Sequence, residues 1–376
     1  MMEAEKRQKE YDVVVVGGGA AGVGVGVALA NAGIWDFVIL ERHVVGGSFA
    51  LWPAETRFIT PSFPTNTIGM LDLNAVALGT SPAFSLAVEH PTGLAYAAYL
   101  GAVARHYALP IQENTLVMRV TKFGDDFLVD TADATIRAKH VIWAAGEFQY
   151  PRLGGFEGAE LCRHTATIPS YENLDGDDFV IVGGYESGVD AAYHLANRGK
   201  QVRLIDSGFP WENRNSDPSI ALSTYSFERM NEDIFVEHVR LSPHSEVTSV
   251  TRVNGVFEVA TLKGDTFKTP VQPLLATGFT GSHKLVAHMF ESREDGFPFL
   301  SEDDESTIVP GLFLCGPAVR HDKHIFCFIY KFRQRFAVVA KAVATSLGLP
   351  AEGLEVYRQW GMYLDDLSLC GEECLC

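Results

Sequence analysis

The stretch VVVVGGGAAGVGVGVALANAGIWDFVILE, residues 13–41, decides the fold. Its valine run predicts a strand over residues 13–16, and the glycines after it predict a tight turn. Residues 20–32 are alanine-rich and predict a helix, and residues 37–40 predict a second strand that ends in an acid, Glu41. This order of strand, glycine turn, helix, strand and acid indicates the βαβ start of a dinucleotide-binding domain.

Three glycines of the turn have separate roles in such a unit. Gly17 permits the tight turn, Gly19 lets the backbone approach a pyrophosphate, and Gly22 lets the helix pack against the strand. The start of the helix offers free N–H groups to the phosphates, and Glu41, 24 residues after Gly17, is placed to accept hydrogen bonds from a ribose. A membrane span is the alternative, because residues 13–35 carry no charge. Seven glycines in those 23 residues argue against a span.

The composition restricts the classes of function. A chain of 376 residues with 47% hydrophobic content has room for two or three domains and a large core. A formal net charge of −17 and a pI near 5.1 disfavour nucleic acid and anionic membrane surfaces as partners. The N-terminal MMEAEKRQKEYD lacks the apolar core of a signal peptide, and no other segment is long and apolar enough to span a bilayer. We therefore expect a cytoplasmic protein.

A second stretch, DDFVIVGGYESGVDAAYHLANRGKQVRLID over residues 177–206, repeats the opening design. It predicts a strand over residues 179–182, a turn that begins at Gly183, a helix from about Ser187, and a strand over residues 201–205. The acid at its end, Asp206, lies 23 residues after Gly183. Two such units in one chain imply two dinucleotides.

The second turn departs from the pattern at Tyr185, which stands where the second glycine belongs. A side chain there would occupy the place where a pyrophosphate approaches the backbone. Either the tyrosine swings aside and the nucleotide binds with altered geometry, or this site has weakened or lost its ligand. Asp206 would repel a 2′-phosphate and so favours NADH over NADPH, although Arg203 and Arg214 could reverse that preference.

The rest of the chain predicts elements around these two units. Residues 42–69 should be irregular and lie along the nucleotide, with close backbone approach at Gly47 and with Trp52 either flanking a flat ring or in the core. We expect a helix over residues 94–107, followed by strands near residues 115–120, 127–129 and 140–145, of which the last returns beside the first strand.

After residue 210 we expect a loop and then strands over residues 246–250, 256–262, 271–279 and 309–317. A final helix is expected over residues 325–347, with an apolar face and with Lys331, Arg333, Arg335 and Lys341 on the other face. It follows directly on Gly316 and Pro317, and its dipole could stabilise negative charge on a bound ring.

Together these motifs resemble the two-dinucleotide-binding flavoproteins, which include thioredoxin reductase and the flavin-containing monooxygenases. The resemblance covers about residues 11–347, and it rests on GGGAAG at Gly17, VIWAAG ending at Gly146, GGYESG at Gly183, LLATGF at Leu274 and GLFLCG at Gly311. The patterns EFQYPRLGGFEG, VGGYESGVDAAYHL and CGPAVRHDKHIFCFIYKFRQRF look most like the bacillithiol disulfide reductase branch.

The resemblance implies an α/β fold with two Rossmann-like domains, in which an NAD(P)-type domain is inserted into an FAD-type domain. The FAD-binding domain would comprise residues 1–150 and 271–350, the NAD(P)H-binding domain residues 151–270, and a cysteine-containing tail residues 351–376. The implied cofactors are FAD and either NADH or NADPH. The residues expected to bind them are Gly17, Gly19, Ala20, Ala21, Gly22, Glu41, Arg42, Gly47, Ser48, Trp52, Val117, Ala145, Gly146, Gly183, Tyr185, Glu186, Ser187, Gly188, Asp206, Gly278 and Gly316.

The sequence also departs from these relatives. Thioredoxin reductase carries a CxxC redox pair in its nucleotide domain, whereas residues 151–270 of this chain contain only Cys162. Pro317 stands where thioredoxin reductase has a flavin-contacting aspartate. The monooxygenase fingerprint FxGxxxH is interrupted, because two extra residues separate Gly158 from His164. Neither of these two chemistries therefore transfers intact.

The C-terminal sequence DDLSLCGEECLC places Cys370, Cys374 and Cys376 in the last seven residues. Such a tail can act as a cysteine relay to the flavin, although the acids around it disfavour the reactive thiolate. It can also hold a soft metal ion, or have no role. Elsewhere, Cys315 and Cys327 lie in apolar contexts and are expected to be buried core thiols. His324, in VRHDKH, is expected either near the flavin as a proton-transfer group or at a solvated helix start.

Three functions follow from these features. The first is an FAD-dependent NAD(P)H oxidoreductase that reduces a disulfide or other thiol-reactive acceptor, with Cys370, Cys374, Cys376 and His324 as candidate catalytic residues. Its acceptor would be a small-molecule or protein disulfide, and its assembly a homodimer. The second is a flavin-dependent monooxygenase, in which the tail has no role. The third is a non-catalytic flavin- or metal-binding redox sensor, which a dead second site at Tyr185 would favour.

Overall fold

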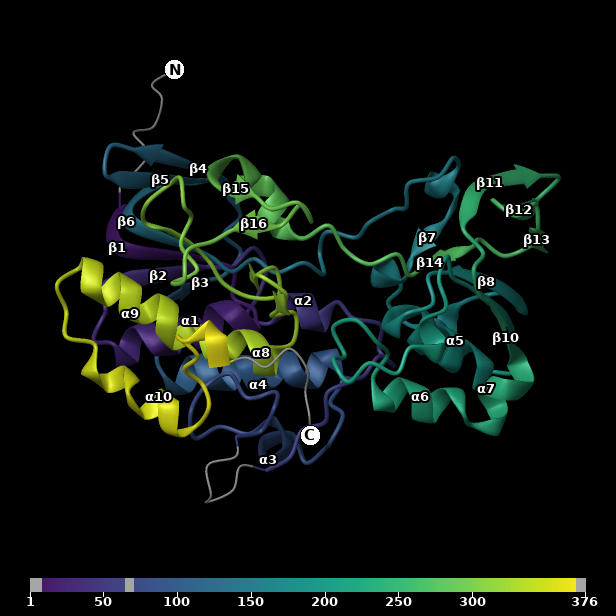
Figure 1. Cartoon of the computed structure of the whole chain (residues 1–376), viewed down its shortest axis with the longest axis horizontal. Coiled ribbons are helices and arrows are strands. Elements are labelled where there is room, and N and C mark those ends of the chain that lie inside the picture. The colour runs from purple at the N-terminus through teal and green to yellow at the C-terminus, as the bar shows by residue number, and fades with distance from the viewer. Residues whose placement is uncertain (1–8, 65–70, 370–376) are drawn as a thin grey trace.

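The computed structural model describes residues 9–64 and 71–369, which fold into two lobes (Figure 1). Within these residues the larger lobe is built on a sheet of seven strands, in the order β3-β2-β1-β6-β5-β4 with β17 beside β6. β1 pairs in parallel with both β2 and β6, so the expected return of residues 140–145 beside the first strand is confirmed. The strands are β1 (Lys9–Val16), β2 (Phe37–Leu40), β3 (Ile111–Gln112), β4 (Val117–Phe123), β5 (Asp126–Thr131), β6 (Thr135–Trp143) and β17 (Leu312–Leu314).

Helix α1 (Ala20–Asn31) is the centre of this lobe and is buried along almost its whole length. It lies between the sheet and α9 (Phe336–Ser346). A Cβ at Gly24 would come within 2.0 Å of the Phe336 ring, and a Cβ at Gly26 would come within 2.8 Å of the Ile39 side chain. The glycines of α1 therefore let the helix lie close to its neighbours on two sides. Three further helices of the lobe are α2 (Gly47–Ala50), α3 (Pro82–Leu86) and α4 (Gly93–His106).

The smaller lobe contains the second unit. Its described strands form a five-stranded sheet in the order β10-β9-β8-β14-β7, all pairs of which are parallel. The chain enters this lobe after β6 and returns to the larger lobe before β17. Its elements are β7 (Arg163–His164), β8 (Asp178–Val182), α5 (Glu186–Ala196), β9 (Gln201–Ile205), α6 (Thr224–Met230), α7 (Asp233–His238), β10 (Val239–Ser242) and β14 (Leu274–Leu275), with a separate antiparallel sheet of β11 (Val247–Val253), β12 (Val256–Thr261) and β13 (Thr266–Thr269).

Several expected elements differ from the structure. The strands expected over residues 271–279 and 309–317 are only the short β14 and β17, and helices α6 and α7 occupy part of the expected loop after residue 210. The helix expected over residues 325–347 begins later, because β18 (Arg320–His321) and β19 (His324–Ile325) form a hairpin. It consists of α8 (Ile329–Phe332), a 3-10 turn over Arg333–Arg335, and α9.

The two arginines assigned to the polar face of that helix are buried, so this prediction was wrong. Arg335 is 0% exposed and pairs with Asp304 at 2.9 Å. Arg333 donates hydrogen bonds to the carbonyl oxygens of Asp72 and Ala75. A buried guanidinium is stable only when its N–H groups meet such partners, and all of these partners lie far away in the sequence.

Residues 351–364 pack against the larger lobe. Leu354, Tyr357 and Met362 are completely buried, and Tyr357 Oη accepts a hydrogen bond of 2.8 Å from Asn31 at the end of α1. Helix α10 (Val356–Gln359) belongs to this segment. The candidate catalytic residues Cys370, Cys374 and Cys376 lie outside the described residues. None of the helices in residues 9–64 and 71–369 has the length and apolar composition that a bilayer crossing requires.

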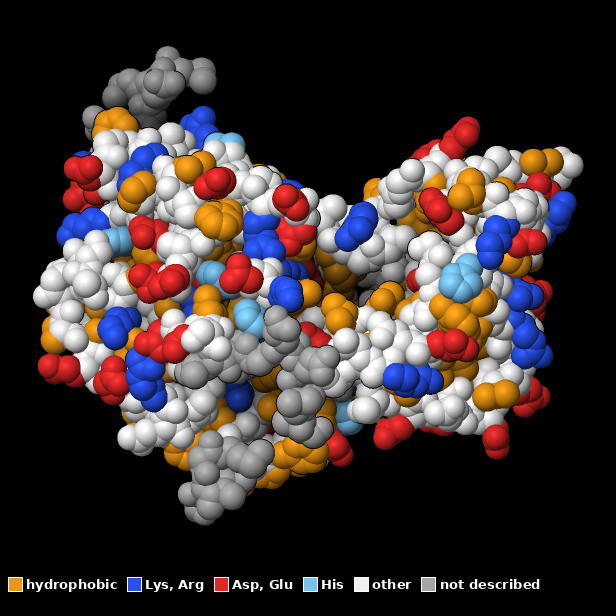
Figure 2. Space-filling model, in the orientation of Figure 1, with side chains coloured by type: hydrophobic (Ala, Val, Ile, Leu, Met, Phe, Trp, Pro, Cys, Tyr) orange, Lys and Arg blue, Asp and Glu red, His pale blue; other side chains and the backbone are white. Residues whose placement is uncertain are grey.

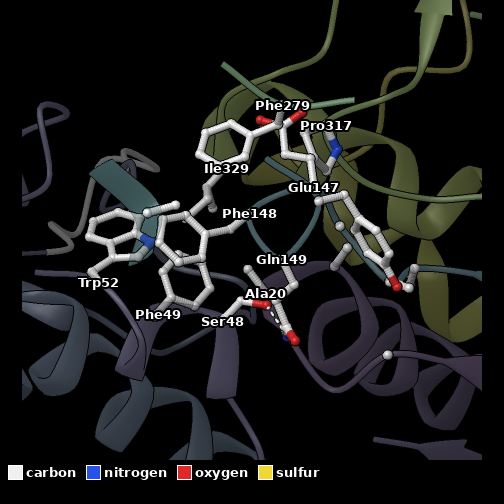
Figure 3. A pocket seen from close by; sticks show the side chains of 18 of the residues that line it. Ala20, Ser48, Phe49, Trp52, Glu147, Phe148, Gln149, Phe279, Pro317 and Ile329 are labelled. Atoms are coloured by element: carbon white, nitrogen blue, oxygen red, sulfur yellow. Dashed lines mark hydrogen bonds between the residues drawn. The ribbon is translucent and has the colours of Figure 1, made fainter. Parts of the chain in front are cut away.

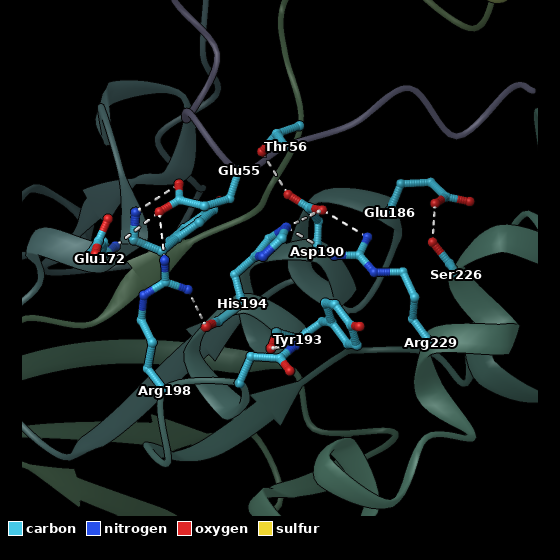
Figure 4. Close-up of polar contacts among 12 residues, drawn as sticks. Glu55, Thr56, Glu172, Glu186, Asp190, Tyr193, His194, Arg198, Ser226 and Arg229 are labelled. Atoms are coloured by element: carbon cyan, nitrogen blue, oxygen red, sulfur yellow. Dashed lines mark hydrogen bonds and ion pairs between the residues drawn. The ribbon is translucent and has the colours of Figure 1, made fainter. Parts of the chain in front are cut away.

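Polar side chains join the two lobes (Figure 4). Thr56, from the larger lobe, donates a 2.6 Å hydrogen bond to Asp190 on α5, and Asp190 pairs with Arg229 on α6 at 2.8 Å. Glu55, next to Thr56, pairs with Arg198 at 3.0 Å. Because Asp190 and Arg229 are both buried, each charge depends on the other for compensation.

We expect Asp190→Asn to lower the free energy of unfolding by about 3–5 kcal/mol, because it leaves Arg229 buried without an anionic partner. Burial alone would raise the pKa of Asp190, but His194, Arg229 and Thr56 hold it at about 2, below its usual 3.8. The stabilisation is therefore present above about pH 4 and is lost as the pH falls through about 2. Urea unfolding at several pH values measures this dependence.

The matched control is Glu258→Gln, which breaks the exposed pair between Lys268 and Glu258. We expect that change to cost less than about 1 kcal/mol. Equal urea midpoints for Asp190→Asn and the wild type at pH 7 would contradict the assignment of the buried pair.

Candidate active site

A cavity of ≈ 420 Å³ lies where the two lobes meet, at the carboxyl ends of β1 and β6. The space-filling view shows a hollow between the lobes, with hydrophobic side chains at its bottom (Figure 2). The first glycine turn, the segment after β6, part of the second lobe and the segment before α8 all contribute to the wall. Ligands of open α/β sheets bind at the carboxyl ends of the strands, so this position suits a cofactor.

The first glycine turn has the geometry that a pyrophosphate needs. Gly17 has φ +109°, and a Cβ on it would lie 2.6 Å from the Ala144 carbonyl oxygen. A Cβ on Gly22 would lie 1.8 Å from the Gly17 carbonyl oxygen, so the helix and the turn are in direct contact. A Cβ on Gly19, in contrast, would meet no heavy atom within 4 Å, which leaves open space above the backbone. The turn therefore fits the phosphates of a dinucleotide.

Glu41 lines the cavity and also braces the turn. Its Oε2 accepts a 2.6 Å hydrogen bond from the Gly18 N–H, and its Oε1 accepts one of 2.8 Å from the His43 N–H. The side chain is only 6% exposed. Sequence reasoning assigned this acid to a ribose and missed its second role, which is to fix the backbone that meets the phosphates.

Aromatic side chains form one wall of the cavity (Figure 3). Trp52 lies 5.3 Å from Phe49, 5.0 Å from Phe58 and 6.2 Å from Phe148, measured between ring centroids. Next to these rings, Gln149 donates a 2.9 Å hydrogen bond to Ser48 at the start of α2. Trp52 thus packs in an aromatic cluster and also lines the cavity, and its contact with a flat ring stays a prediction.

The second glycine turn repeats the first in detail. A Cβ on Gly188 would lie 1.9 Å from the Gly183 carbonyl oxygen. Asp206 accepts 2.7 Å hydrogen bonds from the N–H groups of Gly184 and Gly208, just as Glu41 braces the first turn. The two units therefore share a turn held by the acid at the end of the second strand.

Tyr185 adopts the backbone conformation of its counterpart Gly19. Its φ and ψ are −84° and −163°, against −82° and −164° for Gly19, and both are extended. The side chain is 44% exposed, and its hydroxyl points to the Ile220 carbonyl oxygen at 3.4 Å. The ring of Tyr185 thus extends towards the loop of Ile220. The Cβ of Tyr185 occupies the position that corresponds to the open space above Gly19.

We expect Tyr185→Gly to raise the rate of flavin reduction by NADH or NADPH, because it opens the backbone to a pyrophosphate. Tyr185→Phe is the matched control, since it removes only the hydroxyl contact with Ile220 and should give no gain. Anaerobic stopped-flow absorbance measures both rates. A Tyr185→Gly variant that reduces no faster than the wild type would show that the tyrosine belongs to a working site.

The cavity gathers most of the expected residues of the first unit and two of the second. Those that line it are Gly17, Gly19, Ala20, Ala21, Glu41, Arg42, Ser48, Trp52, Val117, Ala145, Gly146, Glu186 and Ser187. The expected residues that do not line it are Gly22, Gly47, Gly183, Tyr185, Gly188, Asp206, Gly278 and Gly316. Gly22 and Gly188 lie beneath their turns instead, where their missing side chains allow close packing.

His324 does not line the cavity, so the structure does not bring it to the place expected for proton transfer. It lies on β19, and its hairpin partner His321 is buried against Asp304, with Nε2 to Oδ1 at 2.5 Å. Asp304 also pairs with Arg335, so the hairpin is tied to the start of α9. Among the described residues, no cluster of three His, Cys, Asp or Glu side chains suits a metal ion.

Several residues that were not assigned to the site from sequence line the cavity, and Glu147 and Cys327 are two of them. Glu147 directly follows the VIWAAG motif, and this position next to the motif could have indicated from sequence that it belongs to the site. Cys327 was expected in the core because its neighbours are apolar, but it is only partly buried and faces the cavity. Its position depends on how α8 meets the second lobe, which the local sequence does not encode.

Comparison with known proteins agrees with this geometry. A family model described as pyridine nucleotide-disulphide oxidoreductase matches residues 14–316. The chain belongs to that family. The family resemblance inferred from the motifs is thereby confirmed, and this chain is a flavin-dependent oxidoreductase that uses a nicotinamide cofactor.

Individual relatives of this oxidoreductase are distant in sequence. Bacilliredoxin reductase Bdr of Bacillus subtilis (strain 168) is 23% identical over 308 residues, which are 81% of this chain and 88% of that protein. The structure of bacillithiol disulfide reductase Bdr (YpdA) from Bacillus cereus has a TM-score of 0.72 at 21% identity, over 90% of this chain and 100% of that one. A flavin-containing monooxygenase from Stenotrophomonas maltophilia has a TM-score of 0.68 at 18% identity, over 90% and 99% of the two chains. These structures share the fold.

Proposed function

We propose that this oxidoreductase passes electrons from NADH or NADPH through bound FAD to a disulfide or another thiol-reactive acceptor. The observation that carries the proposal is the composition of the cavity wall. Gly17 and Gly19 of the first turn and Glu186 and Ser187 of the second turn line the same cavity. Two dinucleotides held by those turns would therefore bring their reactive ends together between the lobes.

The residues of the larger lobe fit FAD. The open backbone at Gly19 and the start of α1 would hold its pyrophosphate, and Glu41 would hold its ribose. The wall of Trp52 and Phe148 would lie along its flat ring and exclude water. Bound flavin would supply the acceptor for a hydride from the nicotinamide, which amino-acid side chains do not provide.

Two acids of the cavity are suited to hold protons. Burial raises the pKa of Glu147, and the charge of Arg320 only partly offsets this effect. Burial also raises the pKa of Glu186, which accepts hydrogen bonds of 2.5 Å from the Ser223 N–H and the Ser226 hydroxyl. Disulfide reduction consumes a proton for each thiol formed, so a carboxyl group that stays protonated closer to neutral pH has a use there.

The acceptor is proposed from the relatives and from the tail. Two relatives are named as reductases of bacilliredoxin and of bacillithiol disulfide. This chain lacks a CxxC pair in residues 151–270, but it ends with Cys370, Cys374 and Cys376. We propose these tail cysteines as a relay between the flavin and a small-molecule or protein disulfide.

The test is anaerobic consumption of NADH or NADPH by the FAD-loaded protein with a panel of small disulfides and one protein disulfide. We expect consumption that is stoichiometric with the thiols formed. If NADH or NADPH is consumed only in the presence of oxygen and a hydroxylated product forms, the protein is a monooxygenase and the proposed function is wrong. If no acceptor leads to consumption of NADH or NADPH, the proposed function is wrong and the protein has a binding or sensing role.

A further inference from the structure

We propose that Cys327 is the thiol of this chain that exchanges with the acceptor disulfide inside the cavity, which makes it a catalytic residue. The inference rests on the proposed function, and it names the protein group at which the disulfide is opened. Of the cysteines in the described residues, Cys162, Cys315 and Cys327, only Cys327 lines the cavity. Burial raises the pKa of Cys162 to about 11 and that of Cys315 well above its usual range, so both are poor nucleophiles.

The contacts of Cys327 place it at the seam between the lobes. Its Sγ donates a 3.1 Å hydrogen bond to the Ser219 hydroxyl, which comes from the smaller lobe. Lys331 on α8 donates a 2.7 Å hydrogen bond to the same hydroxyl and pairs with Asp217 at 2.6 Å. One hydroxyl therefore connects the thiol to an ammonium group.

The charges around Cys327 act in opposite directions. Burial has the largest effect and raises the pKa of the Cys327 thiol above its usual value, and the negative charge of Glu147 adds to this rise, whereas Lys331 and Arg320 offset it only in part. The Ser219 hydroxyl also stabilises the thiolate. What distinguishes Cys327 from Cys162 and Cys315 is its access to the cavity, together with two cations and a hydroxyl that stabilise the thiolate against the effect of burial.

Glu147 is the second observation that points to a ligand here. It lines the same cavity as Cys327, and within residues 9–64 and 71–369 its carboxyl group has no hydrogen bond or ion pair. Figure 3 shows it beside Pro317 and Phe279. The side chain is partly exposed, and burial raises the pKa of its carboxyl group although the charge of Arg320 lowers it, so the group keeps its proton to a higher pH than an ordinary glutamate. Glu147 is therefore placed to give a proton to a leaving thiolate.

The exchange balances in two steps. The Cys327 thiolate attacks one sulfur of the acceptor disulfide RSSR. A bond forms between that sulfur and Cys327 as the S–S bond of the acceptor breaks. The RS⁻ that leaves takes a proton from Glu147. The mixed disulfide then takes up two electrons and one proton from the flavin that NADH or NADPH has reduced. The products are RSH and the Cys327 thiolate. RSSR is either the external disulfide or a disulfide within the tail.

The first test maps the thiol directly on the full-length, FAD-loaded protein. The protein is reduced, desalted under argon, and treated with a slight excess of the small disulfide DTNB, after which peptides are mapped by mass spectrometry. We expect the adduct on Cys327 to form at least about 10 times faster than on Cys162 or Cys315. An unmodified Cys327, while Cys162 or only the tail cysteines react, would overturn the proposal.

Turnover gives the second readout. Cys327→Ser keeps the size of the side chain and the contact with Ser219, and we expect it to lose at least about 100-fold in disulfide turnover while its flavin is still reduced by NADH or NADPH. Cys162→Ser is the matched control and should turn over like the wild type. Disulfide turnover by Cys327→Ser within twofold of the wild type would overturn the proposal. If the wild type reduces no disulfide at all, the proposed function fails, and the adduct map still decides the reactivity of Cys327.

The pH dependence of alkylation tests the two charged neighbours, and it does not depend on activity. Lys331→Met should move the midpoint of Cys327 alkylation to higher pH, because it removes a stabilising cation. Glu147→Gln should move the midpoint to lower pH, because it removes an opposing anion. Lys268→Met, at an exposed site, is the control and should leave it unchanged. Midpoints that do not shift in opposite directions would contradict the arrangement of charges.

Discussion

The variant Glu41→Lys should purify without bound flavin. Glu41 accepts hydrogen bonds of 2.6 Å from Gly18 and 2.8 Å from His43, and a lysine would place its ammonium against these same N–H groups. Two donors lose their acceptor at about 1–3 kcal/mol each, and the ribose loses its carboxylate partner. A total of about 3–6 kcal/mol corresponds to affinity weakened by a factor of about 100 or more. The ratio of flavin to protein absorbance after purification, followed by FAD titration, measures the loss.

Asp206→Lys makes the same change at the second turn and is the matched control. Asp206 accepts 2.7 Å hydrogen bonds from Gly184 and Gly208, so the damage should be of the same kind. That variant should keep its flavin and lose reduction by NADH and NADPH. Normal flavin content in Glu41→Lys would show that the first turn does not hold the cofactor.

Truncation after Leu369 should abolish turnover with a disulfide acceptor while leaving FAD binding and flavin reduction intact. It removes Cys370, Cys374 and Cys376, and a relay needs two of these thiols to exchange between dithiol and disulfide. A bridge between Cys374 and Cys376 would close a small, strained ring, and strained disulfides are easily reduced, as a relay requires. Steady-state consumption of NADH or NADPH with a protein disulfide measures the effect.

The double variant Glu372→Ala with Glu373→Ala keeps the three thiols and serves as the control, which should turn over. Full activity after truncation would remove the tail relay and leave Cys327 to react with the external disulfide directly. If truncation removes bound zinc or copper but does not lower turnover, the tail binds a metal ion and is not a relay.

The first unit could be predicted from sequence because its signals are local. The valine strand, the glycine spacing and the acid at Glu41 lie within residues 13–41, and the structure forms the expected strand, turn, helix and strand there. The second unit follows for the same reason, including the departure at Tyr185. In both units the bracing of the turn by the acid appears only in three dimensions.

The errors came from contacts between distant parts of the chain. Arg333 and Arg335 fit the polar face of a helix by periodicity, but their buried partners are Asp304 and the carbonyl groups of Asp72 and Ala75. Cys327 looked like a core thiol among Phe and Ile neighbours, and only the contact with Ser219 across the seam between the lobes shows its place. Such pairings, from residues about 30 to more than 200 positions apart, leave no periodic pattern in the sequence.

Anaerobic titration of the purified protein with NADH and with NADPH, followed by addition of a disulfide, tests the central claim most directly. The account predicts a yellow protein whose flavin absorbance is bleached by about one equivalent of one of the two nucleotides, since two electrons reduce one flavin. The disulfide should then restore the yellow colour and release thiols. A colourless protein that takes up no FAD, or a bound flavin that neither nucleotide reduces, would contradict it.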